Sequence, residues 1–203
     1  MLAAGLVLTG LTTGCGSQGA RNTIKLGGNL EMTGESASYG ISSRNGIELA
    51  LKEQNERGGV LDKKVELVVA DNKSEATEAT NAMQKLIPQD RVIGVIGPNL
   101  SSAVIASTAV SGVAKTADIS PMGTNPQVTV DGLGKVKPYN FRACFIDPFQ
   151  GTVMAHFALN TPKVKRAAIM IDNSSDYSKG LAQFFKKQFE KGGGEVVAEE
   201  VYL

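Results

Sequence analysis

Few residues in this chain of 203 residues could carry out catalysis. The single histidine, His156, lies in an apolar helical pattern, where a structural role is typical. Cys144 sits inside an apolar run, as a small buried side chain does, and its only companion, Cys15, is far away in the sequence, so no metal-ligand spacing arises. Neither common type of glycine-rich phosphate loop is present. We therefore expect a protein that is not an enzyme and that has no metal and no cofactor.

Two hydroxyl-bearing loops could instead bind a small zwitterion. The segment Gly97-Pro98-Asn99-Leu100-Ser101-Ser102 follows a run rich in Val and Ile and opens a helical pattern. Backbone N–H groups and hydroxyls at such a helix N-terminus suit a carboxylate. The turn 120–126 offers free carbonyls and the Thr124 hydroxyl to an ammonium group. Two alternatives stay open: Ser101 or Ser102 could only cap its helix, and turn chemistry alone could explain the second segment.

Strands and helices must hold these loops, and the chain alternates between the two patterns. Apolar runs typical of strands buried on both faces lie at 23–30, 65–70, 92–96, 118–120, 141–145, 167–171 and 195–202. Stripes with helical spacing lie between them, with Ser74 and Ser101 where N-caps belong and Gly58 and Gly192 after two helix ends. The alternation predicts an α/β fold with parallel sheets flanked by helices, whose ligands bind beyond the carboxyl ends of the strands.

The charge balance argues against a nucleic-acid partner. The chain has 21 basic and 20 acidic residues, which nearly cancel. A protein that grips a phosphate backbone needs a basic surface, and this composition does not supply one in bulk.

The N-terminal segment predicts export and lipid attachment. Residues 2–11 form an almost unbroken apolar stretch, too short to span a bilayer, and small residues follow it before Cys15. We interpret residues 1–14 as a signal peptide, Cys15 as the lipidated residue and 15–22 as a flexible tether. The run around Cys15 resembles a bacterial lipobox, although Thr12 stands where a large aliphatic residue is usual. An unprocessed secretory signal with an incidental cysteine is the alternative. Because no basic residue precedes the apolar stretch, we expect the true start to lie upstream.

Several ordered motifs resemble those of the amino-acid-binding lipoproteins of branched-chain-type ABC importers, the leucine/isoleucine/valine-binding class. They are Tyr39-Gly40, Asn55-Glu56-Arg57-Gly58-Gly59-Val60, Asp71-Asn72-Lys73-Ser74, Val95-Ile96-Gly97-Pro98, Ile119-Ser120-Pro121, Phe145-Ile146-Asp147-Pro148-Phe149-Gln150-Gly151 and Asp176-Tyr177-Ser178-Lys179-Gly180-Leu181-Ala182. The resemblance implies a two-lobed type I periplasmic-binding-protein architecture. It places a nearly complete lobe one at 23–145 and the beginning of lobe two at 146–203, and we expect the rest of lobe two to lie beyond Leu203.

The resemblance also implies roles for residues of lobe one. Ser101 would hold the carboxylate of an amino-acid ligand through its hydroxyl and backbone N–H, assisted by Thr124. The carbonyl of Met122 and the hydroxyl of Thr124 would take the α-ammonium.

Three further ligand contacts follow from the same resemblance. Tyr39 of lobe one and Tyr177 of lobe two would close over the ligand, and Asp147 near the lobe crossover would also touch it. The alternatives are loop aromatics for the two tyrosines and, for Asp147, a cap on a helix that begins near Phe149.

The implied function is that of an extracytoplasmic solute-binding component of an ABC transporter. Such a protein works with permease subunits and is held at the membrane by its lipid. The Asp-Asn-x-x-Asp-Tyr-x-Lys-Gly pattern of residues 172–180 is most similar to that of receptors from Gram-positive bacteria. A ligand-sensing domain of the same fold, belonging to a receptor or regulator, is the alternative.

Overall fold

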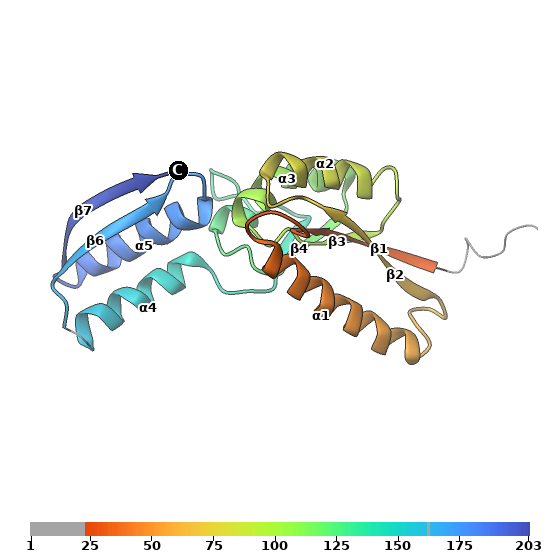
Figure 1. Ribbon diagram of the computed structural model, residues 1–203, viewed down its shortest axis with the longest axis horizontal. Coiled ribbons are helices and arrows are strands. Elements are labelled where there is room, and N and C mark those ends of the chain that lie inside the picture. The colour runs from red at the N-terminus through yellow and green to blue at the C-terminus, as the bar shows by residue number, and fades with distance from the viewer. Residues whose placement is uncertain (1–22, 162) are drawn as a thin grey trace, which may run out of the picture.

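The computed structural model describes residues 23–161 and 163–203. Strands and helices alternate along the chain and form two units (Figure 1). The first unit comprises β1 (Thr23–Leu30), α1 (Ala37–Glu56), β2 (Lys64–Asp71), α2 (Ala76–Leu86), β3 (Gly94–Ile96), α3 (Ser101–Ala114), β4 (Ala117–Ser120), the short 3-10 helix η2 (Pro126–Val128) and β5 (Asn140–Arg142). The second comprises α4 (Asp147–Asn160), β6 (Arg166–Asp172), α5 (Asp176–Lys191) and β7 (Glu195–Tyr202).

The first unit is a parallel sheet with helices on both faces. Its strand order is β2-β1-β3-β4-β5, and all four neighbouring pairs are parallel. Helix α1 lies on one face, and α2 and α3 lie on the other (Figure 1). The α/β fold with parallel strands is thus confirmed, and each predicted apolar run contains a strand, although the run 141–145 is a strand only at Asn140–Arg142.

The core of the first unit lies between the sheet and α2. It contains Ala70, Ala82, Met83, Leu86, Val92 and Val95. The central strand comes close to this layer because β1 has glycine at position 27. A Cβ atom there would lie 3.2 Å from methyl groups of both Val92 and Val95. The carboxyl ends of the strands point toward the second unit (Figure 1).

Two predicted N-caps are each wrong by one position. Helix α2 begins at Ala76 with Glu75 as its N-cap, because Ser74 adopts a left-handed conformation with φ 64°. The Ser74 hydroxyl instead donates to the Thr33 carbonyl at 2.9 Å and so ties two loops together. Ser101 is the first residue of α3 rather than its cap.

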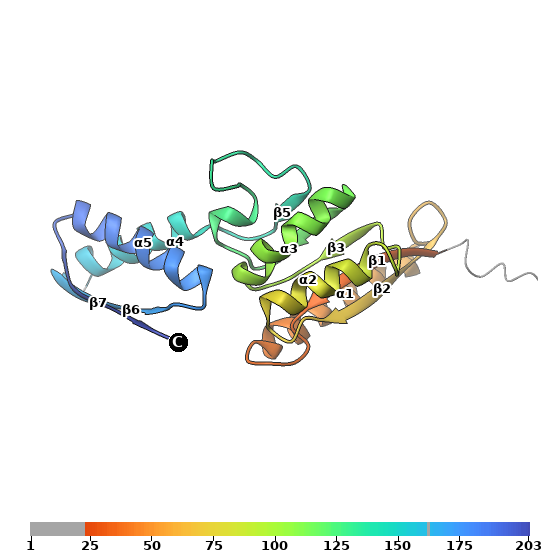
Figure 2. The ribbon, with the colours of Figure 1, turned by 90° about the horizontal axis from the view of Figure 1, so that it is seen from above.

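The second unit is a parallel pair of strands, β6 and β7, packed on α5, with α4 beside α5 (Figures 1 and 2). A close approach of α4 to α5 occurs at Gly151, where a Cβ atom would lie 2.8 Å from the Phe184 Cβ. The prediction that these strands are buried on both faces is wrong within the described residues, since Met170 is 75% exposed and Val201 is 64% exposed. Among residues 23–161 and 163–203, no helix is long and apolar enough to cross a membrane.

A buried carboxyl group, Asp118, lies inside the first unit on β4. It is only 1% exposed, and its Oδ2 accepts a hydrogen bond from the Asn140 Nδ2 at 3.2 Å, while its Oδ1 is buried without a partner. Burial raises the pKa of Asp118 from 3.8 to about 7, and the Asn140 hydrogen bond opposes that rise only in part. Between about pH 4 and pH 7 the folded state therefore holds a proton that the unfolded chain has released.

This buried carboxyl group should make stability depend on pH. Folding raises the pKa of Asp118, so the contribution of this carboxyl group to the free energy of unfolding is complete below about pH 4 and is lost as the pH rises to about 7. The slope is at most about 1.4 kcal/mol per pH unit. We expect Asp118→Asn to remove this slope in chemical unfolding of the full-length protein at pH 4.5, 6 and 7.5. The matched control Asp62→Asn changes an exposed side chain and should keep the wild-type profile. Parallel profiles for Asp118→Asn and the wild type would contradict the assignment.

Candidate functional site

The carboxyl ends of β1 and β3 are joined by one buried carboxylate, that of Glu31. It is fully buried, its Oε1 accepts from the Asn99 N–H at 3.0 Å and from the Leu100 N–H at 3.4 Å, and its Oε2 accepts from the Asn99 Nδ2 at 2.7 Å. Asn72 at the end of β2 donates to the same carboxylate at 3.3 Å. Glu31 therefore holds the loop that leads into α3 in one conformation.

The loop after β4 is held by two further polar side chains. The Ser120 hydroxyl donates to the Pro98 carbonyl at 2.7 Å and accepts from the Gly123 N–H at 2.9 Å, which connects the two candidate loops. The Arg142 guanidinium on β5 donates to the carbonyls of Gly123 and Asn125, both at 2.9 Å. The turn that carries Met122 and Thr124 is consequently fixed from both sides.

Ser101 and Thr124 are brought together at this edge of the sheet. The Ser101 hydroxyl accepts from the N–H of Asn125, the residue after Thr124, at 3.3 Å. Helix α3 has no side-chain cap, so the alternative that Ser101 or Ser102 serves only to cap α3 is wrong. The Thr124 hydroxyl is buried without a hydrogen-bond partner.

Asp147 joins this pair from the second unit. Its N–H donates to the Thr124 carbonyl at 3.0 Å, and the residue is fully buried. Helix α4 begins at Asp147 with Ile146 as the N-cap and no side-chain cap bond, so the capping alternative for Asp147 is wrong too. Burial raises the pKa of the Asp147 carboxyl, and the neighbouring Thr124 hydroxyl and Arg142 guanidinium offset this in part.

Unpartnered acceptors concentrate at this place. Both carboxylate oxygens of Asp147, the Thr124 Oγ1 and the Gln150 Oε1 are buried and form no hydrogen bond. Thr124 stays near Asp147 without bonding to it, although its hydroxyl is close enough to lower the pKa of that carboxyl. Buried acceptors without partners are costly, so this arrangement is suited to a ligand that donates hydrogen bonds.

The remaining predicted residues, Met122, Tyr177 and Tyr39, are all partly exposed to solvent. Met122 is in the loop between β4 and Thr124, with a side chain that is 42% exposed. Tyr177 is in the first turn of α5, and its hydroxyl accepts from the Gln150 Nε2 at 3.0 Å. Tyr39 lies in the first turn of α1 rather than in a loop, and its side chain is half exposed. It takes no part in the hydrogen bonds described above.

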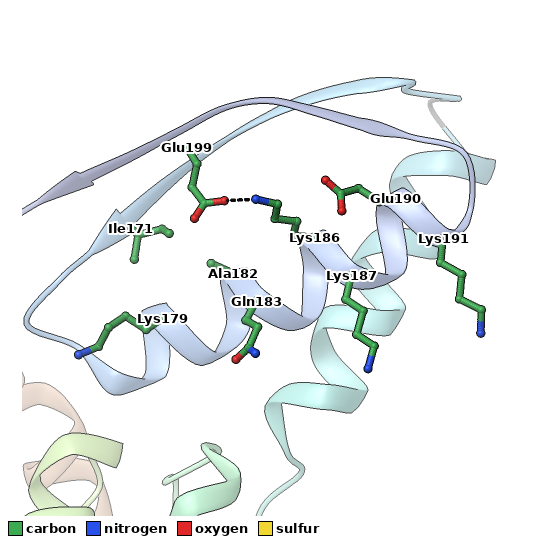
Figure 3. Close-up of a pocket in the computed structure, with 9 residues that line it drawn as sticks. All are labelled: Ile171, Lys179, Ala182, Gln183, Lys186, Lys187, Glu190, Lys191 and Glu199. Carbon is green, nitrogen blue, oxygen red and sulfur yellow. Dashed lines mark hydrogen bonds and ion pairs between the residues drawn. The ribbon is translucent and has the colours of Figure 1, made fainter.

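A separate groove of about 720 Å³ lies between α5 and the β6–β7 pair, away from Ser101 and Thr124 (Figure 3). Its lining carries four lysines and two glutamates, and Lys186 pairs with Glu199 at 2.7 Å. The groove is broad and open, and none of the unpartnered buried polar atoms belongs to its lining. We therefore place the functional site at the sheet edge instead of in this groove.

A comparison with protein families shows to which family this chain belongs. A family model described as a periplasmic binding protein matches residues 23–203. The chain belongs to the periplasmic binding protein family. An amino acid binding protein of Pseudomonas aeruginosa is 35% identical over 168 residues, which are 83% of this chain and 44% of that protein. The Leu/Ile/Val-binding protein BraC3 of Rhizobium johnstonii is 34% identical over 183 residues, or 90% of this chain and 48% of that one.

Solved structures of periplasmic binding proteins have the same fold. The branched-chain amino acid transporter substrate-binding protein LivJ from Streptococcus pneumoniae, in complex with isoleucine, is 38% identical with a TM-score of 0.79, covering 89% of this chain and 50% of that one. The leucine-binding protein LivK from Thermotoga maritima is 36% identical with a TM-score of 0.78, covering 88% and 48%. The chain thus spans about half the length of the relatives it matches.

The sequence patterns did not identify two residues that this periplasmic binding protein uses to build the site. Glu31 follows directly after a strand that ends in a buried stretch, and an acidic residue at that point is a signal that could have found it. Asn125 lies inside the predicted turn, but only the folded chain shows that its side chain reaches α5, where its Nδ2 donates to the Asp176 carbonyl at 2.8 Å.

Replacing Glu31 by glutamine should destabilise the protein markedly. The NH2 group of the glutamine would replace one of the two acceptor oxygens of Glu31. It would then face either the Asn99 Nδ2 or the N–H groups of Asn99 and Leu100, all of which are donors. At least one buried donor would be left unsatisfied, at a cost of about 2–4 kcal/mol. Chemical unfolding of the full-length protein measures the change. The control Glu35→Gln alters an exposed side chain in the next loop and should change the unfolding free energy by less than about 0.5 kcal/mol. Equal effects of the two variants would refute the organising role of Glu31.

Proposed function

We propose that this periplasmic binding protein is the extracytoplasmic solute-binding component of an ABC importer and that it binds an amino acid, branched-chain or similar. The observation that carries the proposal is the cluster of buried, unpartnered oxygens of Thr124 and Asp147 beside the first turn of α3. The N-terminus of α3 beside this cluster is suited to an anion and the Asp147 carboxyl group to a cation, as a zwitterion requires.

The carboxylate of the ligand would bind at the α3 N-terminus. Ser101 is the first residue of that helix, where free N–H groups and the positive end of the helix dipole favour an anion. The Ser101 hydroxyl accepts from Asn125, so its own proton is available to the ligand. The Thr124 hydroxyl has no partner and would supply a second hydrogen bond.

The ammonium group would bind the acceptors on the other side. The Met122 carbonyl and the Thr124 hydroxyl are hydrogen-bond acceptors, and Asp147 adds a negative charge. A cation beside the buried Asp147 would favour the ionised carboxylate and lower its pKa, which burial holds above the ordinary value. Ligand binding should therefore favour the ionised form of this group.

Binding would bring the two units together over the ligand. In this proposal residues 23–145 and 146–203 belong to two lobes, with Tyr39 on the first and Tyr177 on the second. A ligand that touches both lobes favours the closed arrangement by population shift, and the permease subunits recognise that arrangement. No bond of the ligand is broken, so the protein acts as a receptor and not as an enzyme.

The ligand hypothesis is tested by calorimetric titration of the full-length protein with L-leucine, L-isoleucine and L-valine. Ser101→Ala and Thr124→Ala should each weaken binding by about 10- to 100-fold, the effect of losing a hydrogen bond to a charged group. Thr116→Ala is the control, because this hydroxyl follows the far end of α3 and donates to the Ala114 carbonyl. Absence of binding to the wild type, or equal affinities for all variants, would refute the proposed site.

We also propose that the protein is held at the outer face of the cell membrane by a lipid on Cys15, as in a Gram-positive bacterium. Residues 1–22 lie outside the described residues, so this proposal rests on the apolar stretch and the small residues before Cys15. Radiolabelled palmitate fed to the producing cells should label the wild type and Cys144→Ser, and Cys15→Ser should lose the label. Label retained by Cys15→Ser would show that Cys15 is not the attachment site.

A further inference from the structure

The main chain of a single residue, Asp176, is held on both sides by the first unit. Its N–H donates to the Ser102 hydroxyl at 2.8 Å, and its carbonyl accepts from the Asn125 Nδ2 at 2.8 Å. Asp176 is the first residue of α5, whose opening turn faces that of α3 (Figure 2). An N–H at this position has no partner within its own helix, so a side chain of the other unit satisfies a helix terminus of this one.

Every polar group of Asn125 forms a hydrogen bond. Its N–H donates to the Ser101 hydroxyl at 3.3 Å, its Oδ1 accepts from the Gln127 N–H at 2.9 Å, and its carbonyl accepts from the Arg142 guanidinium at 2.9 Å. The side chain is buried. Asn125 therefore connects the Ser101 hydroxyl, which is proposed to bind the ligand carboxylate, with the first turn of α5. A shift of either group would displace the other.

Gly180 provides the space for this contact one turn further along α5. A Cβ atom at this position would lie 2.9 Å from the Asn125 Nδ2 and 2.7 Å from the Asp147 Oδ2, both closer than real Cβ atoms approach. The absence of a side chain at position 180 thus allows α5 to approach the loop that carries Thr124.

We propose that Ser102, Asn125, the Asp176 main chain and Gly180 form a latch that holds the two units together and positions Tyr177. Tyr177 directly follows Asp176, so the latch positions its backbone. The Tyr177 hydroxyl accepts a hydrogen bond from Gln150 on α4, which positions the phenol ring. None of the four latch groups has to touch the ligand. The latch deepens the proposed function, on which its effect on affinity rests.

The latch should act through the population of the arrangement in which the units touch. The apparent affinity of a ligand falls by the fraction of protein in the binding-competent state. Loss of one hydrogen bond of this kind lowers the equilibrium constant for the touching arrangement on the order of fivefold, and this sets the upper limit on the fall in its population. Latch variants would therefore bind more weakly even though the residues proposed to touch the ligand are intact.

The experiment compares glycine and hydroxyl variants in matched pairs of the full-length protein. Gly180→Ala is paired with Gly112→Ala on α3, where a Cβ atom would meet nothing within 4 Å, and both changes favour their helices locally. Ser102→Ala is paired with Thr116→Ala at the far end of α3. Small-angle X-ray scattering without any amino acid measures the separation of the units, calorimetry with L-isoleucine measures affinity, and thermal melts confirm that each variant is folded.

We expect a larger radius of gyration for Gly180→Ala and Ser102→Ala than for their controls, with affinity for L-isoleucine weakened by up to about fivefold for the loss of one hydrogen bond. A radius of gyration equal to that of the controls would overturn the latch. If the wild type binds none of the three branched-chain amino acids, the proposed ligand class fails, while the scattering comparison still decides whether the latch exists.

Discussion

The arrangement of the site depends on the hydrogen bonds of one buried carboxylate. Glu31 directly follows the first strand, β1, and accepts hydrogen bonds from donors in the loops after β2 and β3. A carboxylate removed from water is tolerated only when donors surround it, so those loops are held at fixed positions around it. Since α3 starts in one of them, the direction of that helix N-terminus follows from the same interaction.

The loops of the first unit are fixed by hydrogen bonds, but several polar groups where the two units meet form no hydrogen bond. Ser120 and Arg142 hold the loop of Thr124 through its carbonyls and N–H groups, whereas the Thr124 hydroxyl and the Asp147 carboxylate bond to nothing. Groups that are fixed but unpartnered are preorganised, which lowers the cost of ordering them when a ligand arrives. Such a site suits reversible binding of a small polar molecule.

The loop whose groups we propose to bind a ligand also contacts the second unit. Asn125 is adjacent to Thr124 and reaches both Ser101 and Asp176. In the proposed site, ligand binding and contact between the units would be coupled through neighbouring residues instead of a long path. This short connection is consistent with a receptor whose two lobes respond as a pair to one ligand.

The sequence by itself determined the alternation of strands and helices, because period and residue type are local properties that are read along the chain. It also singled out Ser101 and Thr124 as candidate ligand contacts, because both lie in segments that directly follow strands, whereas Asp147 was suggested only by the resemblance to a known family. Only the tertiary structure decided that Glu31 joins three loops, that Ser101 begins its helix instead of capping it, and that Asn125 spans two units. The contacts of Glu31 and Asn125 join residues 24 to 69 positions apart in the chain, which no local pattern encodes.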